Sequence, residues 1–316
     1  MPTMLESLPL RKFGLEFEIG GELGVATVAG VIRSLSFHPV NCTTSWRQSI
    51  NNNYWDVKFD RTCGVLGEIN NVYIDHGWEI ASYIACGETD LDHIAAVMAE
   101  FERITSSTPN HNCGFHIHCD VSDFSPREIG ILMARWIKIE PMLCQMVPGH
   151  RINNKFCRLL SAKRISKRKR YKPEEVWGRL KPTKYTPHDN IQKKVTLNTV
   201  NYAAALQTET EATALKSVAL KDIRKTVEFR LPEGTLKKDA INGWVHFFVR
   251  FVESSKRAAM PANLGEVSKI KQFFKYCDMS KINSNLDLLR AKLFLIERLY
   301  KFGNEEVKKQ LSQGLF

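Results

Sequence analysis

Four short segments of the chain alternate apolar and charged residues, and they are residues 13–19, 55–60, 113–120 and 227–231. Alternation with a period of two predicts β-strands, in which successive side chains point to opposite faces. The polar residues that share a face are Glu16 with Glu18, His116 with His118, and Glu228 with Arg230. The pattern therefore predicts a sheet with one apolar face and one face of acids, imidazoles and arginine.

A strand with one solvated face would show the same alternation. Solvated faces, however, are usually built of Lys, Thr, Ser and Gln. The polar positions here read Glu-x-Glu, His-x-His and Glu-x-Arg, so like charges would repel one another unless cations or phosphates lie between them. The pattern in all four segments favours a binding site over a solvated surface.

Helical patterns separate these strands. Ser125 is suited to cap a helix that has Pro126 at its first position and Glu128 at its third, with apolar residues at helical spacing after them. Two further helices are predicted, one starting at residue 89 or 90 and reaching about 105, and an aromatic-rich one over 238–256. Short strands with helices between them predict an α+β fold rather than a doubly wound parallel sheet.

The chain changes character after about residue 261, where acids and histidines are no longer grouped. Helical segments are predicted there at 273–276, 286–300 and 305–311. We expect a catalytic domain over 1–260 and a helical C-terminal extension over 261–316, which serves as a packing element or as a contact for a partner. A chain of 316 residues is long enough to bury the core of such a domain.

One segment accounts for most of the positive charge. Residues 161–194 hold twelve lysines and arginines against three acids, so they carry nine of the eleven net charges. We expect an insertion loop within the catalytic domain, with one short helix near 174–180. A solvated loop would explain this charge. The density of positive charge also suits an anionic partner, which would be a nucleotide, an acidic protein, or a nucleic acid whose bases stack on Tyr171 and Trp177.

Cysteine spacing and hydropathy narrow the class of protein. The eight cysteines include no Cys-x-x-Cys pair, which excludes a zinc ribbon and a thioredoxin-type motif. No apolar run is long enough to cross a membrane, and the first residues lack the basic-then-apolar order of a signal peptide. The sequence also has no Gly-x-Gly-x-x-Gly and no Walker loop. We expect a cytoplasmic protein without membrane contact, which holds any nucleotide by another geometry.

The predicted polar face suits divalent cations and phosphate. Closely set carboxylates with a single imidazole bind Mg²⁺ or Mn²⁺, hard ions that prefer oxygen ligands. Such cations would offset the repulsion among the acids and could bridge the phosphates of ATP. Arg230, beside Glu228, and Arg151 can hold a phosphoryl group or a substrate carboxylate in bidentate fashion. Acids, cations and arginines together favour phosphoryl chemistry.

Six motifs, in this order, carry a family resemblance. They are Phe-Gly-Leu-Glu-Phe-Glu (13–18), Trp-Asp-Val-Lys-Phe-Asp (55–60), Gly-Trp-Glu-Ile-Ala-Ser (77–82), Cys-Gly-Phe-His-Ile-His (113–118), Arg-Ile-Asn-Asn-Lys-Phe-Cys (151–157) and Glu-Phe-Arg-Leu-Pro-Glu-Gly-Thr (228–235). From about Phe13 to Phe251 the chain resembles the putative amidoligase family, which belongs to the carboxylate-amine ligase superfamily with glutamine synthetase and glutamate-cysteine ligase. Two departures, Thr62 in place of a serine and Tyr83 in place of a proline, concern substrate detail.

The resemblance implies a fold and a set of metal ligands. The fold would be a curved antiparallel sheet of the glutamine synthetase and glutamate-cysteine ligase type, with flanking helices and a concave face that binds ATP and divalent ions. The implied metal ligands are Glu16, Glu18, Glu79, His116 and Glu228. For His118, a role as a supporting histidine is as well founded as a role at the metals.

Further roles follow from the same resemblance. Asp60 would stand near the metals or the incoming amine. Arg230 and Arg151 would contact phosphate or the substrate carboxylate. The cofactor would be held by Arg230 together with two other residues of the motifs, Lys58 and Asn153.

The reaction implied by the resemblance is ATP-dependent formation of an amide or isopeptide bond. A substrate carboxylate would take the γ-phosphoryl group, and an amine would displace phosphate from the acyl phosphate, with Asp60 or Glu79 as the base. One of the two substrates could be macromolecular. Two other readings stay open: a metal-dependent hydrolase that uses His116 and His118, and a nucleic-acid-binding protein that uses residues 161–194.

Overall fold

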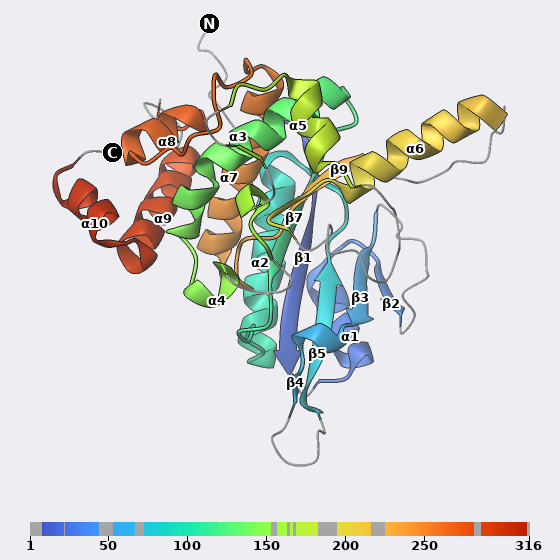
Figure 1. The fold of residues 1–316 in the computed structure, drawn as a ribbon. Helices are drawn as coiled ribbons and strands as arrows, with labels where there is room; N and C mark the ends of the chain where they lie inside the picture. The colour runs from blue at the N-terminus through green and yellow to red at the C-terminus, as the bar shows by residue number, and fades with distance from the viewer. Residues whose placement is uncertain are drawn as a thin grey trace, which may run out of the picture. The chain divides into compact units, whose positions relative to one another are not determined.

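A computed structural model describes residues 8–21, 23–43, 53–66, 73–152, 157–162, 165–166, 169–182, 195–215, 225–280 and 286–314. It is a mixed α+β structure, as the sequence predicts (Figure 1). The strands are β1 (Lys12–Gly21), β2 (Val40–Thr43), β3 (Trp55–Phe59), β4 (Val65–Leu66), β5 (Tyr73–Ala81), β6 (Ala85–Cys86), β7 (Phe115–Asp120), β8 (Leu197–Asn198) and β9 (Thr226–Phe229). The four predicted strands are confirmed as β1, β3, β7 and β9.

These strands form one open sheet in the order β2-β3-β5-β1-β7-β9-β8, with β4 beside β5 and β6 beside β1. The described pairings of β1 with β5, β3 with β5 and β8 with β9 are antiparallel, as expected. The pairing of β2 with β3 is parallel. Parallel neighbours need a connection longer than a hairpin turn, and residues 44–54 separate these two strands. Helix α1 (Val25–Leu35) precedes β2. The sheet is therefore mostly, and not wholly, antiparallel.

The other helices of the described residues are α2 (Gly87–Thr105), α3 (Pro126–Cys144), α4 (Gly149–Ile152), α5 (Pro173–Leu180), α6 (Val200–Leu215), α7 (Lys238–Lys256), α8 (Ile270–Tyr276), α9 (Leu286–Phe302) and α10 (Glu305–Ser312). The predicted helices are confirmed as α2, α3, α5 and α7, and those of the C-terminal region as α8, α9 and α10. None of the described helices combines the length and the apolar character that a membrane span requires.

The chain folds into two compact units. The first comprises Met1–Ile117, Pro232–Phe247 and Ser284–Phe294, and the second comprises His118–Leu231, Phe248–Asn283 and Leu295–Phe316. Strand β7 contributes to both, because the division falls between Ile117 and His118. The domain boundary at residue 260 stays a prediction, since residues from both sides of it enter each unit.

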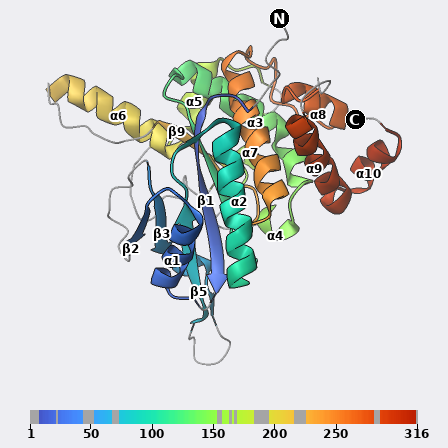
Figure 2. The ribbon, with the colours of Figure 1, turned by 180° about the vertical axis from the view of Figure 1, so that it is seen from behind.

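In the first unit, β1 shows the alternation that the sequence predicts. Its apolar residues Phe13, Leu15, Phe17 and Ile19 are all buried. Helices α1 and α2 supply apolar side chains to the same core, among them Val28, Ile32, Leu91, Ile94 and Met98. Figure 2 shows both helices over one face of the strands. Burial of this face leaves the opposite face of β1 for its glutamates.

The second unit is built around helix α3. Ser125 and Glu128 form the predicted capping box: the Ser125 hydroxyl accepts a hydrogen bond from the Glu128 N–H, and the Glu128 carboxylate accepts one from the Ser125 N–H at 2.7 Å. Trp136 of α3 packs on Phe229 of β9, with ring centroids 5.2 Å apart. Phe229 stacks in turn on Phe248 of α7 at 4.4 Å. This aromatic core fixes the strand that carries Glu228 and that Arg230 directly follows.

Candidate functional site

Strand register places four acids on the polar face of the first unit. Glu18 of β1 lies directly opposite Glu79 of β5, and Glu79 lies opposite Lys58 of β3. The neighbouring row contains Glu16 and Asp56, which flank Ala81. Residues that lie opposite one another in antiparallel strands share a face, so all five charged side chains lie on one side of the sheet. We call Glu16, Glu18, Asp56 and Glu79 the acid row.

Lys58 is the basic side chain within this row. Its Nζ lies 2.5 Å from Oε1 of Glu79. Burial, and then the charge of Glu16, raises the pKa of the Glu79 carboxyl to about 7, although Lys58 acts to lower it. Burial alone would lower the pKa of Lys58, but Glu79 and Glu16 outweigh it and raise that pKa above the ordinary lysine value. The carboxylates around Lys58 therefore favour its protonated form.

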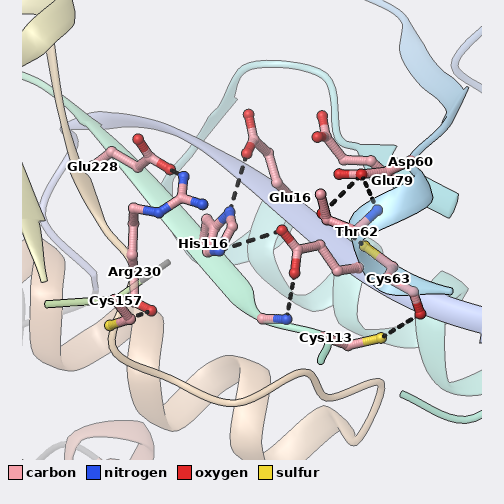
Figure 3. A network of polar contacts seen from close by, with 12 residues as sticks. Glu16, Asp60, Thr62, Cys63, Glu79, Cys113, His116, Cys157, Glu228 and Arg230 are labelled. Carbon is pink, nitrogen blue, oxygen red and sulfur yellow. Dashed lines mark hydrogen bonds and ion pairs between the residues drawn. The ribbon is translucent and has the colours of Figure 1, made fainter. Parts of the chain in front are cut away.

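His116 of β7 lies between two of these acids (Figure 3). Its Nδ1 is 3.3 Å from Oε2 of Glu16, and its Nε2 is 3.5 Å from Oε1 of Glu18. A neutral imidazole carries one N–H, so it can donate to only one of the two carboxylates. The other carboxylate oxygen of Glu18, Oε2, accepts a hydrogen bond from the backbone N–H of Gly114 at 2.5 Å. This bond orients the Glu18 side chain along the strand.

Asp60 follows β3 and is held by its own loop. Its Oδ1 accepts hydrogen bonds from the N–H and the hydroxyl of Thr62, both at 2.8 Å. The Asp60 N–H donates to the carbonyl of Gly77 at 2.8 Å, and a Cβ at position 77 would come within 2.0 Å of the Asp60 carbonyl oxygen. This close approach requires glycine, which explains the Gly77 of the third motif.

Cys63 lies beside Asp60 and Glu18, and the ligand atoms of the three residues lie within 4.8 Å of one another. A hydrogen bond with the Cys113 thiol, and then burial, raises the pKa of Cys63 above the ordinary thiol value. Cys63 is therefore a neutral thiol, and the oxygen atoms of Glu18 and Asp60 are the ligands that a hard cation would take there. Nothing in the spacing of the cysteines points to this position.

In the second unit, Glu228 of β9 forms an ion pair with Arg230, the first residue after the strand (Figure 3). Asn198 of β8 lies opposite Glu228 and donates its side-chain N–H to Oε2 at 2.6 Å. Nε2 of His118 lies 4.0 Å from Oε1 of Glu228. We call Glu228, Arg230 and Asn198 the arginine group. Both oxygens of Glu228 thus accept a hydrogen bond, one from Arg230 and the other from Asn198.

Arg151 is placed differently from the sequence-based expectation of direct substrate contact. Its side chain is buried, and the residue is only 2% exposed. Its guanidinium donates to the carbonyl of Arg230 at 2.7 Å and to that of Leu231 at 3.4 Å. The Cys157 thiol donates to the same Arg230 carbonyl at 3.2 Å. These contacts hold the backbone of Arg230 in place, and contact of Arg151 with a substrate stays a prediction.

A buried carboxylate that sequence reasoning missed accepts hydrogen bonds from residues that adjoin the basic segment 161–194. Glu140 of α3 is 0% exposed and accepts the backbone N–H groups of Leu160 and Ser161 at 2.8 and 2.7 Å. It also accepts hydrogen bonds from Trp136 and the Thr196 hydroxyl. Ser161, at the start of the segment, and Thr196, two residues beyond its end, thereby contact the same side chain.

Within the basic segment, the predicted short helix is confirmed as α5. Lys169 and Arg179 lie over the ring of Tyr171, at 5.4 and 5.6 Å from its centroid. Binding of an anionic partner by this segment stays a prediction. Asn153, a predicted nucleotide contact, lies outside the described residues.

The acid row fits a divalent cation. It offers carboxylate oxygens, which Mg²⁺ and Mn²⁺ prefer, and it places Glu18 and Glu79 opposite each other, an arrangement that is unfavourable without a cation. Asp56 belongs to this row although it was not among the predicted ligands. Its alternation with Lys58 in the second motif was the signal that could have identified it.

Comparison with known protein families identifies the family of this chain. The family model described as "Putative amidoligase enzyme" matches residues 9–252. The match covers all six motifs and both polar groups, and it ends within α7. No curated protein sequence matches the chain.

Proposed function

The chain belongs to the putative amidoligase family, and on that premise we propose that it is an ATP-dependent carboxylate-amine ligase that works through an acyl phosphate. The observation that carries this proposal is the acid row, in which buried carboxylates face one another across β1 and β5. A binding face of this kind repels phosphate unless cations are present. It therefore suits a nucleotide that arrives with Mg²⁺ or Mn²⁺.

The metal ligands in this proposal are Glu16, Glu18 and His116, which all lie in the first unit. Glu228, which the sequence also predicts as a ligand, belongs to the second unit. The described contacts support Glu16 and Glu18, because an oxygen of each lies 3.3 and 3.5 Å, respectively, from a ring nitrogen of His116. A bound Mg²⁺ would neutralise phosphate charge during the reaction.

In the first chemical step, an oxygen of the substrate carboxylate attacks the γ-phosphorus of ATP. The bond between that phosphorus and the β–γ bridging oxygen breaks, and ADP leaves with the electron pair. Arg230 stabilises the charge that develops on the transferring group, because its guanidinium is charged at every working pH and is oriented by Glu228. Lys58 is the candidate for a second cationic contact to the nucleotide.

In the second step, the amine attacks the carbonyl carbon of the acyl phosphate. The bond from carbon to the phosphate oxygen breaks, phosphate leaves, and the amine gives up a proton. The raised pKa of Glu79, near 7, supports Glu79 as the acceptor of that proton. Asp60 is less suited, because its Oδ1 already accepts two hydrogen bonds from Thr62.

Incubation with ATP, Mg²⁺ and pooled carboxylates and amines, followed by mass spectrometry, tests this function. We expect ADP and an amide product to appear together, and both to require the carboxylate, the amine and Mg²⁺. The Glu18→Gln variant should make neither, whereas Glu100→Gln, a change at an exposed glutamate of α2, should behave like the unaltered protein. Turnover of a substrate without ATP would instead identify the metal-dependent hydrolase.

A further inference from the structure

Helix α9 carries two apolar faces. One is buried in the fold and consists of Leu288, Ala291, Leu295 and Leu299. The other consists of Leu286, Leu289, Leu293 and Tyr300, which are 59, 37, 48 and 50% exposed. These four are the majority of the seven large hydrophobic residues that are exposed in the described part of the chain. A helix with apolar side chains on both sides is normally covered on both sides.

The exposed residues form a continuous stripe, which we call the α9 stripe. Leu286, Leu293 and Tyr300 recur every seven residues, and Leu289 follows Leu286 by one turn. At about 3.6 residues per turn, these positions stay on one side of the helix over its whole length. The spacing is that of a seam between two helices, and the described residues of this chain leave the seam uncovered.

Charged residues along the edge of the stripe show which partner fits it. Arg290 precedes Leu293 by three residues, and Glu297 follows it by four, so both lie on the same edge. If a second α9 lay antiparallel across the first with Leu293 near the centre, Arg290 of each copy would meet Glu297 of the other. Leu286 of each would meet Tyr300 of the other, and Leu293 would meet its own counterpart. The stripe is thus complementary to itself in charge and in size.

We propose that the α9 stripe joins two copies of this chain in a symmetric dimer, with the two α9 helices antiparallel. The contact is isologous, because the same patch serves on both copies. Four apolar side chains and one reciprocal pair of charges per copy make a small interface, so the dimer dissociates readily on dilution. The proposal does not depend on the reaction that the protein catalyses.

Sedimentation equilibrium of the full chain over a range of concentrations tests the dimer. We expect the mass to rise from one chain towards two as the concentration increases. Leu293→Glu should keep the protein monomeric, since it would bring two carboxylates together at the centre of the contact. Leu10→Glu is the matched control at another exposed leucine and should associate like the unaltered protein. Circular dichroism should show that both variants fold, because neither side chain is buried.

The orientation of the two helices is tested by reversing charges. Arg290→Glu alone should weaken the association, because it would face Glu297 on both sides of the contact. Adding Glu297→Arg should restore it. A monomeric unaltered protein at high micromolar concentration, or full association of Leu293→Glu, would overturn the dimer. Failure of the second charge reversal to rescue the first would overturn the antiparallel arrangement.

Discussion

The acid row and the arginine group differ in their balance of acidic and basic side chains. In the acid row of the first unit, Lys58 and His116 are the basic side chains of the described contacts, and Glu18 faces Glu79 across two strands. In the arginine group of the second unit, Glu228 is matched by the guanidinium of Arg230 and the amide of Asn198. Among these described contacts, acids outnumber basic side chains in the acid row, whereas the arginine group pairs one acid with one arginine.

This difference indicates what each group does. A cluster with excess negative charge gains stability from a cation, so the acid row is suited to bind metal and, through it, phosphate. A balanced group holds its shape without a ligand. Arg230 gains further rigidity because Arg151 and Cys157 hold its carbonyl oxygen. It is therefore suited to present a preoriented charge to a group in transfer.

The largest effect is expected from removing a charge in the acid row. Glu18→Gln keeps the hydrogen bond from Gly114 but weakens the cation ligand, so ATP-dependent turnover should fall by more than about 100-fold, since even outer partners of metal ligands cost roughly 10- to 100-fold. ADP release measures it. Unchanged turnover would remove Glu18 from the site and leave the acid row without its proposed role.

A smaller loss is expected in the arginine group. Arg230→Lys keeps the charge but loses the planar fork that pairs with Glu228, so kcat should fall by roughly 10- to 100-fold while the affinity for ATP changes less. Steady-state kinetics combined with ATP titration separates the two quantities. If the variant loses only thermal stability, with normal turnover per folded molecule, Arg230 is a structural ion pair.

The acid row should also make stability depend on pH when EDTA removes metals. The pKa of Glu79 is about 7 in the folded chain against an ordinary value of 4.5, so between these values the folded state holds a proton that the unfolded state has lost. The free energy of unfolding should therefore fall as pH rises through this window, by up to about 3 kcal/mol. Urea denaturation measures it. Glu79→Gln should flatten the slope, and an equal slope in that variant would assign it to another group.

The smallest effects concern the free energy of unfolding at a fixed pH. Removal of one carboxylate should change it in opposite directions in the acid row and in the arginine group. In EDTA, Glu18→Gln removes a like charge opposite Glu79 and should leave the free energy of unfolding unchanged or raise it by up to about 1 kcal/mol. Glu228→Gln leaves Arg230 without its carboxylate and should lower it by about 1–3 kcal/mol. Destabilisation of equal size by both changes would show that the acid row is balanced within the protein.

Much of this arrangement could be predicted from local sequence pattern. The alternation of Phe13 to Ile19 fixed both the strand β1 and the shared face of Glu16 and Glu18, because strand periodicity depends only on neighbouring residues. The cap at Ser125 was predicted for the same reason, since its partners lie within three residues. Local interactions determine these features.

The contacts that could not be predicted join residues far apart in the sequence. In the sequence, Glu140 is indistinguishable from an exposed polar residue of a helix. In the fold it contacts Leu160 and Thr196, which lie twenty and fifty-six residues further along the chain. Asn198 becomes a neighbour of Glu228 only when β8 pairs with β9. Arg151 has the chemistry of a phosphate ligand. In the fold, however, it donates hydrogen bonds to the carbonyls of Arg230 and Leu231, which directly follow β9.

The need of the acid row for a cation is tested most directly by calorimetric titration of the protein with ATP, once with Mg²⁺ and once with EDTA. ATP should bind in the presence of Mg²⁺ and should not bind in EDTA, because the carboxylates of the acid row repel the phosphates until a cation lies between them. Glu18→Gln should bind ATP more weakly than the unaltered protein when Mg²⁺ is present. Binding of ATP with equal affinity in Mg²⁺ and in EDTA would contradict the account.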